Sequence, residues 1–92
     1  MRIYVSNLGS QITEESLQAI FSAHGEVSDI EIAIDAFTGN SRGFAFVEMP
    51  QALQATAAIH HINESVIDGK VISAAQTAPK RVLQGSYAVR NN

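Results

Sequence analysis

The chain has 92 residues, 46% of them hydrophobic, and a formal net charge of −3 at pH 7. This length suits a single small domain, which buries roughly 60–65% of the surface that its unfolded chain exposes. Cysteine is absent, which excludes disulfide bonds and thiolate metal sites. No apolar run approaches the length of a membrane span, and the first predicted strand leaves no room for a signal peptide. We therefore expect a cytoplasmic protein that makes no contact with membranes.

The first predicted element is a strand. From Ile3 to Leu8, apolar side chains alternate with polar or aromatic ones, which is the period-2 pattern of a half-buried strand. Ile3 and Val5 are predicted to point into the core. The side chains on the opposite face are then Arg2, Tyr4 and Ser6.

A helix is predicted next, with Thr13 as its N-cap and with Glu14 and Glu15 at the positive end of its dipole. We expect Gly25 to end this helix, with His24 in its last turn. The apolar stripe of the helix consists of Leu17, Ile20 and Phe21.

Two more strands are predicted on either side of a turn-rich loop at residues 35–40. The second strand opens at Val27, and its outward side chains are Asp29, Glu31 and Ala33, with Ile30 and Ile32 inward. The third strand runs from Arg42 to Met49. Its core face consists of Gly43, Ala45, Val47 and Met49, and its opposite face of Arg42, Phe44, Phe46 and Glu48.

The remaining elements complete a β-α-β-β-α-β order. Pro50 marks the start of a second helix, which Asn63 is expected to end in a left-handed conformation. The predicted apolar stripe of this helix consists of Ala52, Ala55, Ile59 and Ile62. A short strand at residues 66–67, a hairpin turn at Asp68 and Gly69, and a last strand at residues 70–75 follow. The order predicts an α+β, ferredoxin-like sandwich over residues 1–78, in which two helices cover one face of a four-stranded antiparallel sheet.

The first and third strands would expose three aromatic rings on the uncovered face, so these rings would not stabilise the fold by being buried. Stacking on unpaired bases is a physical reason for such exposure. The two stretches resemble the two ribonucleoprotein motifs of the RNA-recognition motif family, and the likeness extends over about residues 2 to 77. Arg42, Gly43, Phe44, Ala45, Phe46 and Val47 match the octamer pattern, in which Met49 replaces the final aromatic residue. Ile3 to Leu8 match the hexamer throughout.

The resemblance, which is to small single-domain bacterial members, implies a protein that binds a few nucleotides of single-stranded RNA, with single-stranded DNA as a further candidate. It implies that Tyr4 and Phe44 each stack under a base, that the ring of Phe46 packs against sugars, and that Arg42 contacts phosphate. The other residues expected to bind RNA are Arg2, Ser6, Ser73, Ala75, Gln76, Lys80 and Arg81.

Charge is distributed unevenly along the chain. Residues 1–79 contain three cations and nine acids, whereas residues 80–92 contain three cations and no acid. We expect residues 79–92 to form a flexible basic tail, which would either hold the phosphate backbone or cover Phe44 and Phe46. Glu31 and Glu48 are expected on the open face, where they would repel phosphates. Affinity for RNA should therefore be modest and depend mainly on stacking.

The alternative function is a protein-interaction module of the same fold, which would hold a peptide on its helices or on its aromatic sheet. We expect a monomer rather than a homodimer. Catalysis, a cofactor and a metal site are not expected, because His60 and His61 are adjacent on one helix and point in different directions, and His24 is distant in sequence. The loop at residues 35–40 lacks the alternating acids of a calcium loop.

Overall fold

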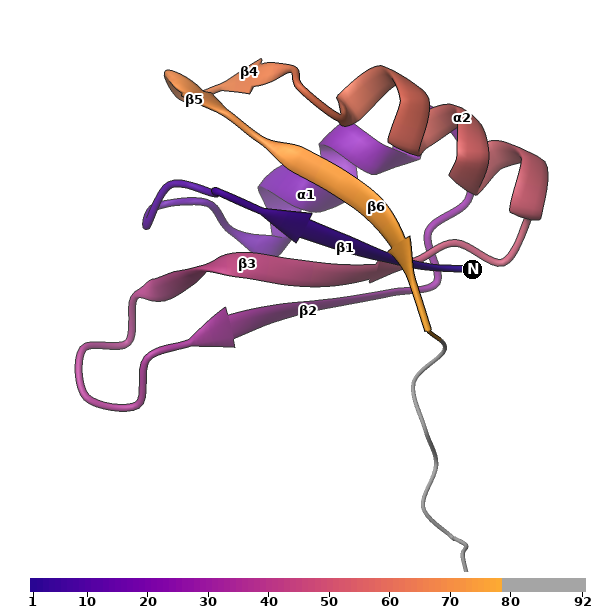
Figure 1. Cartoon of the computed structure of the whole chain (residues 1–92). Coiled ribbons are helices and arrows are strands. Elements are labelled where there is room, and N and C mark those ends of the chain that lie inside the picture. Colours follow the sequence, from indigo (N-terminus) through magenta and orange to yellow (C-terminus); the bar gives the residue numbers. More distant parts are fainter. Residues whose placement is uncertain (79–92) are drawn as a thin grey trace, which may run out of the picture.

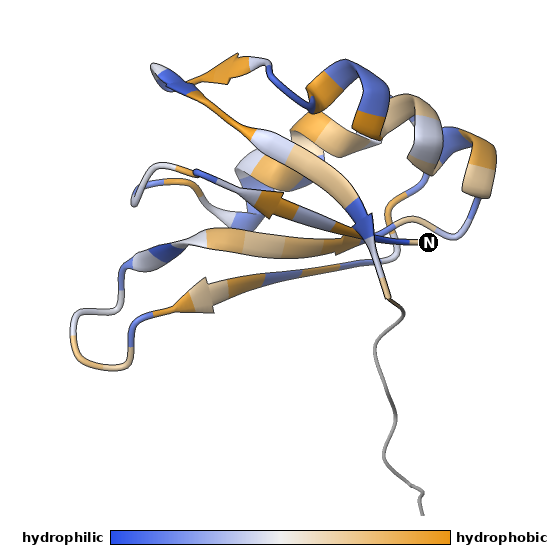
Figure 2. Ribbon diagram, in the orientation of Figure 1, coloured by the Kyte–Doolittle hydropathy of each residue, from blue (hydrophilic) through white to orange (hydrophobic). Residues whose placement is uncertain are grey.

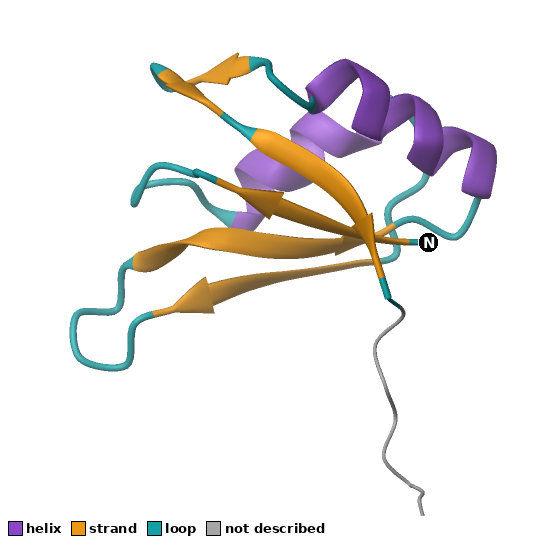
Figure 3. Cartoon of the chain, in the orientation of Figure 1, coloured by secondary structure: helices purple, strands orange, loops and turns teal. Residues whose placement is uncertain are grey.

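The computed structural model describes residues 1–78, in which eight elements follow one another (Figure 1). They are β1 (Arg2–Ser6), α1 (Glu14–Ser22), β2 (Asp29–Ile34), β3 (Ser41–Glu48), α2 (Ala52–Ile62), β4 (Val66–Ile67), β5 (Lys70–Val71) and β6 (Ser73–Thr77). Four strands form one antiparallel sheet in the order β2-β3-β1-β6. This order places the two motif-bearing strands at the centre and leaves β2 and β6 at the edges. Both helices lie on the same side of the sheet, and no helix or strand within residues 1–78 covers its other face (Figure 3).

The core lies between the sheet and the two helices. The alternation predicted for β1 and β3 is confirmed, because Ile3, Val5, Ala45 and Val47 are fully buried. Met49, which stands where the octamer pattern has its final aromatic residue, is also fully buried. This departure from the pattern therefore affects the packing of the core. Figure 2 shows the alternation of apolar and polar residues along β2, an edge strand whose Ile30 and Ile32 are only half-buried.

Helix α1 begins as predicted and ends earlier than predicted. The Thr13 hydroxyl oxygen accepts a hydrogen bond from the Ser16 backbone N–H at 3.1 Å, which confirms the N-cap. The helix ends at Ser22, with Ala23 as its C-cap, so Gly25 and His24 both follow it. The expectation that Gly25 ends the helix was wrong. The last turn of α1 closes earlier, through the hydrogen bond from the His24 N–H to the Phe21 carbonyl at 2.9 Å.

Helix α2 packs on the sheet through a shorter stripe than expected. Its buried residues are Ala55, Ala58 and Ile62, and Ile59 is half-buried. Ala52 was wrongly placed in the stripe, because residues 51–54 at the start of the helix are all exposed. Asn63 follows the helix with φ −58°, and the left-handed residue is instead Glu64, with φ 66°. The side-chain oxygen of Asn63 accepts a hydrogen bond from the Ala74 N–H at 3.0 Å, which joins the end of the helix to β6.

The strand predicted at residues 70–75 is divided in two. β5 pairs with β4 across the turn formed by Asp68 (φ 52°) and Gly69 (φ 77°), which confirms the hairpin. β6 pairs with β1 instead. The break falls at Ile72, whose N–H and carbonyl bond to Ser65 and Glu64 at 2.9 and 2.8 Å. No helix within residues 1–78 is long and apolar enough to cross a bilayer.

Candidate nucleic-acid interface

Three aromatic rings meet at the centre of the uncovered face. Tyr4 in β1 lies directly opposite Phe46 in β3, and Ser6 lies opposite Phe44. The Tyr4 ring centroid is 5.8 Å from that of Phe44 and 5.5 Å from that of Phe46, and the two phenylalanine rings are 6.3 Å apart. All three residues are half-buried rather than fully exposed, because each ring packs against the other two. We call Tyr4, Phe44 and Phe46 the aromatic platform.

Arg2 lies on the same face but is almost fully buried, with 8% of its surface exposed. Its side chain extends from β1 across β3 to β2, where Nη2 is 2.8 Å from Oε1 of Glu31. On the way, the guanidinium carbon lies 4.3 Å from the centroid of the Phe46 ring, which is a cation–π contact. Arg2 was expected to contact RNA, and in the structure it is already held by one acid and one ring of the chain itself.

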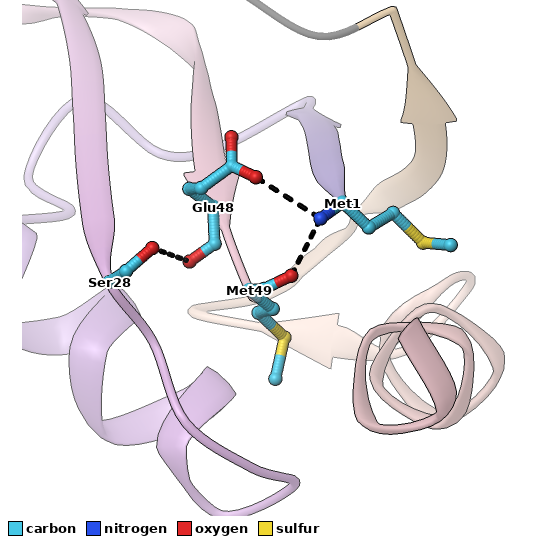
Figure 4. Close-up of polar contacts among 4 residues, drawn as sticks. All are labelled: Met1, Ser28, Glu48 and Met49. Carbon is cyan, nitrogen blue, oxygen red and sulfur yellow. Dashed lines mark hydrogen bonds and ion pairs between the residues drawn. The ribbon is translucent and has the colours of Figure 1, made fainter. Parts of the chain in front are cut away.

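Glu48, the second acid expected to repel phosphates, is also paired. Its Oε2 is 3.1 Å from the amino group of Met1, which also donates to the Met49 carbonyl at 2.7 Å (Figure 4). The Ser28 hydroxyl donates to the Glu48 carbonyl at 3.3 Å, so the residue that precedes β2 is joined to the end of β3 (Figure 4). Glu31 and Glu48 are therefore each opposed by a positive charge, which weakens the repulsion expected from these two acids.

The loop between β2 and β3 is ordered by Asp35. Its carboxylate accepts hydrogen bonds from the N–H groups of Phe37 at 2.8 Å and Thr38 at 3.1 Å. The bonds from Thr38 and Phe37 hold the pKa of Asp35 below its ordinary value, with a smaller contribution from the positive charge of Arg42. Arg42 itself is exposed at the start of β3, where its guanidinium can approach a phosphate.

The last strand of the sheet borders the aromatic platform. Ser73 lies opposite Ser6 and Ala75 opposite Tyr4, so both share the open face. Gln76 lies opposite the buried Ile3, so it belongs to the face that carries the helices, although it is exposed at that position. Lys80 and Arg81 lie outside the described residues.

Two further contacts were not foreseen from the sequence. The side-chain amide of Asn7 donates to the Val71 carbonyl at 2.7 Å and joins the end of β1 to β5. His24 and His61, which seemed distant, stack with ring centroids 5.1 Å apart. Within residues 1–78, however, no three His, Cys, Asp or Glu side chains are grouped so that they could hold a metal ion.

Comparison with known proteins places these features in context. A family model described as "RNA recognition motif" matches residues 3–73. The chain is 38% identical over 86 residues to RbpB of Nostoc sp., covering 94% of this chain and 84% of that protein. It is also 38% identical to glycine-rich RNA-binding protein 1 of Mycosarcoma maydis, covering 94% of this chain and 50% of that one. The crystal structure of RNA Binding Protein PG1 superimposes with a TM-score of 0.84 at 32% identity, covering 89% of this chain and 99% of that chain.

Proposed function

The chain belongs to the RNA recognition motif family, and from that premise we propose that it binds a few nucleotides of single-stranded RNA on the open face of its sheet. The observation that carries this proposal is the aromatic platform. Three rings from the two central strands lie within 5.5 to 6.3 Å of one another, on the sheet face opposite the two helices of residues 1–78. A base offers a flat π-surface whatever its sequence, and aromatic rings accept it by stacking.

Stacking alone can supply useful affinity. Each stacked base contributes about 1–3 kcal/mol. Two or three such bases reach the micromolar range, about −8 kcal/mol, once the cost of ordering the strand has been subtracted. The pairing of Glu31 with Arg2 and of Glu48 with the amino group of Met1 supports this estimate, because neither carboxylate faces the RNA without a nearby cation.

Each side chain near the platform has a proposed part. The rings of Tyr4 and Phe44 stack under bases, and the ring of Phe46 contacts the next nucleotide through its sugar or its base. Arg42 contacts a phosphate from the exposed start of β3. Ser6, Ser73 and Ala75 line the adjacent surface towards β6, where small side chains leave room for the strand.

We include the basic segment in the proposal. β6 ends at Thr77, opposite Arg2, at the same end of the sheet as Glu48. Residues 80–92 hold half of the six cations of the chain and no acid. Lys80 and Arg81 follow within a few residues of the open face, so they can reach the phosphates of RNA that is stacked on the platform.

An NMR titration tests the proposal. The ¹⁵N-labelled full chain is titrated with a pool of short randomised RNA, and a pool of DNA of the same length serves as the comparison. We expect shifts at residues 2–6, 42–48 and 73–77. Shifts confined to α1 and α2, or no shifts at all, would contradict RNA binding on the sheet, and shifts of the helices with a peptide library would support the protein-interaction module instead.

A further inference from the structure

A hollow of about 260 Å³ opens beside one ring of the platform, between β2 and β3. Its lining consists of Glu31, Ile32, Ala33 and Phe46. A single water occupies about 30 Å³ in the liquid, so the hollow has room for a larger group. It combines an aromatic ring with a carboxylate, which are the two features needed to stack a base and to bind its edge.

Glu31 is fixed in this position from two directions. It lies directly opposite Phe46 in the pairing of β2 with β3. Its carboxylate is bonded at 2.8 Å to the guanidinium of Arg2, which is itself held against the Phe46 ring. Because Arg2 is only 8% exposed, the guanidinium has little freedom to move. The Glu31 side chain nevertheless remains 46% exposed, so the carboxylate can be approached from solvent.

The chemistry of the carboxylate distinguishes the bases. A carboxylate only accepts hydrogen bonds, and its two oxygens can accept several at once. A base that rests on Phe46 turns one edge towards Glu31. Guanine presents two adjacent donors on its pairing edge, N1–H and the N2 amino group, which match two carboxylate oxygens. Uracil presents one N–H between two carbonyl oxygens, and these would face the negative charge.

We propose that Glu31 selects guanine for the nucleotide bound at Phe46, and that Arg2 is a positioning residue that orients the carboxylate. This inference rests on the proposed RNA binding and deepens it. The Arg2–Glu31 pair also explains how an acid is tolerated on a surface that binds a polyanion, since the guanidinium offsets its charge towards the phosphates.

The test uses fluorescence anisotropy with labelled hexanucleotides, one of uridines alone and six with a single guanosine moved along the strand. We expect the full chain to prefer at least one guanosine-containing strand by about fivefold or more, which is the lower end of the discrimination that a bidentate side chain gives. Glu31→Gln should reduce the preference to within about twofold and tighten binding of the uridine strand, because a negative charge is removed. Glu15→Gln removes the same charge from the exposed surface of α1 and should keep the preference.

Arg2→Met separates the two members of the pair. Methionine keeps an apolar stem against the Phe46 ring and leaves the Glu31 carboxylate in place, so the guanine preference should fall but persist. The inference is overturned if Glu31→Gln keeps the full preference, or if Arg2→Met abolishes it while Glu31→Gln does not. Failure of the proposed function looks different, since the unmodified chain would then bind none of the strands. Thermal melts of each variant establish that it is folded.

Discussion

Gly25 packs directly against Gln54, so closely that a Cβ atom at residue 25 would lie 2.5 Å from the Cβ of Gln54. The side-chain oxygen of Gln54 also accepts a hydrogen bond from the Glu26 N–H at 2.9 Å. The segment that follows α1 is therefore fastened to the first turn of α2, and the fit depends on the missing side chain of Gly25.

We expect Gly25→Ala to lower the free energy of unfolding by about 1–3 kcal/mol, because the added methyl group must displace Gln54 or separate the two helices. Urea unfolding measures the change. The control is Gly9→Ala, since a Cβ at Gly9 would meet nothing closer than 4.0 Å. Its effect should stay within about 0.5 kcal/mol. Equal losses for the two variants would contradict the close packing at Gly25.

Removing a platform ring should affect binding more than folding. Phe44→Ala or Tyr4→Ala is expected to weaken RNA binding by about 1–3 kcal/mol, the contribution of one stacked base. The unfolding free energy should fall by only about 0.5–1.5 kcal/mol, the contribution of a ring pair on a half-buried surface. Isothermal titration calorimetry and thermal melts measure the two effects.

Val47→Ala is the matched control for the platform variants. It lies in the same strand as Phe44 but is fully buried on the core face, so it should cost about 1.5–3 kcal/mol of stability and little affinity in the folded fraction. Full RNA affinity in Phe44→Ala would show that this ring does not stack on a base.

The dependence of affinity on salt should be shallow. Within residues 1–78 there are three cations, and one of them, Arg2, is paired with Glu31. On a single strand, each neutralised phosphate contributes about −0.7 to the slope of log affinity against log salt concentration. Two to four phosphate contacts should therefore give a slope of about −1.4 to −2.8. Anisotropy titrations at several salt concentrations give this slope. A much steeper slope would reveal a basic surface that the described residues lack.

Asp35 should make the loop between β2 and β3 sensitive to acid. The hydrogen bonds from Thr38 and Phe37 lower the folded-state pKa of Asp35 below its unfolded value. The Asp35 carboxyl therefore binds a proton less readily in the folded protein than in the unfolded one. Its contribution to the stability of the fold is complete above the pKa of the unfolded state and is lost as pH falls through the pKa of the folded state. An NMR titration from about pH 5 downward should show the amide signals of residues 37 and 38 moving together with the Asp35 carboxyl.

Asp35→Asn is the control for that titration. Its side-chain oxygen can still accept both hydrogen bonds, but it carries no titrating group, so the two amide signals should stay in place over the same range. Movement of these signals in the variant would mean that another acid governs the loop.

Deleting residues 79–92 should weaken RNA binding and leave the fold intact. The segment adds three cations to a part of the chain with a net charge of −6, so the loss should be greatest at low salt. The full chain and residues 1–78 are compared at two salt concentrations. Tighter binding by the shorter chain would instead support the tail as a cover for Phe44 and Phe46.

Strand alternation was the part of the structure most open to prediction. The core-facing Ile3, Val5, Ala45 and Val47 of β1 and β3 are fully buried, whereas Tyr4 and Phe44 on the open face are half-buried. Helix ends were harder to predict, because they depend on tertiary contacts. α1 ends before Gly25, and the missing side chain of this glycine allows its close fit against Gln54.

The electrostatics of the site could not be read from single residues. Arg2, Glu31 and Glu48 come from three different strands. Which charges pair depends on the strand register, which brings Arg2 beside Phe46 and Glu31. The same holds for Asn7, whose partner Val71 is 64 residues away. Sequence patterns identify which face a residue occupies, whereas pairing across strands needs the folded sheet.

Among the strands of residues 1–78, β2 lies at the edge of the sheet and pairs with a neighbour on one side alone. A second copy that extended the sheet there, antiparallel to the first, would bring the acids at Asp29 and Glu31 towards those of its partner, and like charges across strands are destabilising. The register of β2 against β3 also shifts between Ile32 and Ile34, which makes this part of the edge strand irregular. Extension of the sheet from β2 of one copy to β2 of another is therefore disfavoured, so this edge resists the growth of a continuous β-structure.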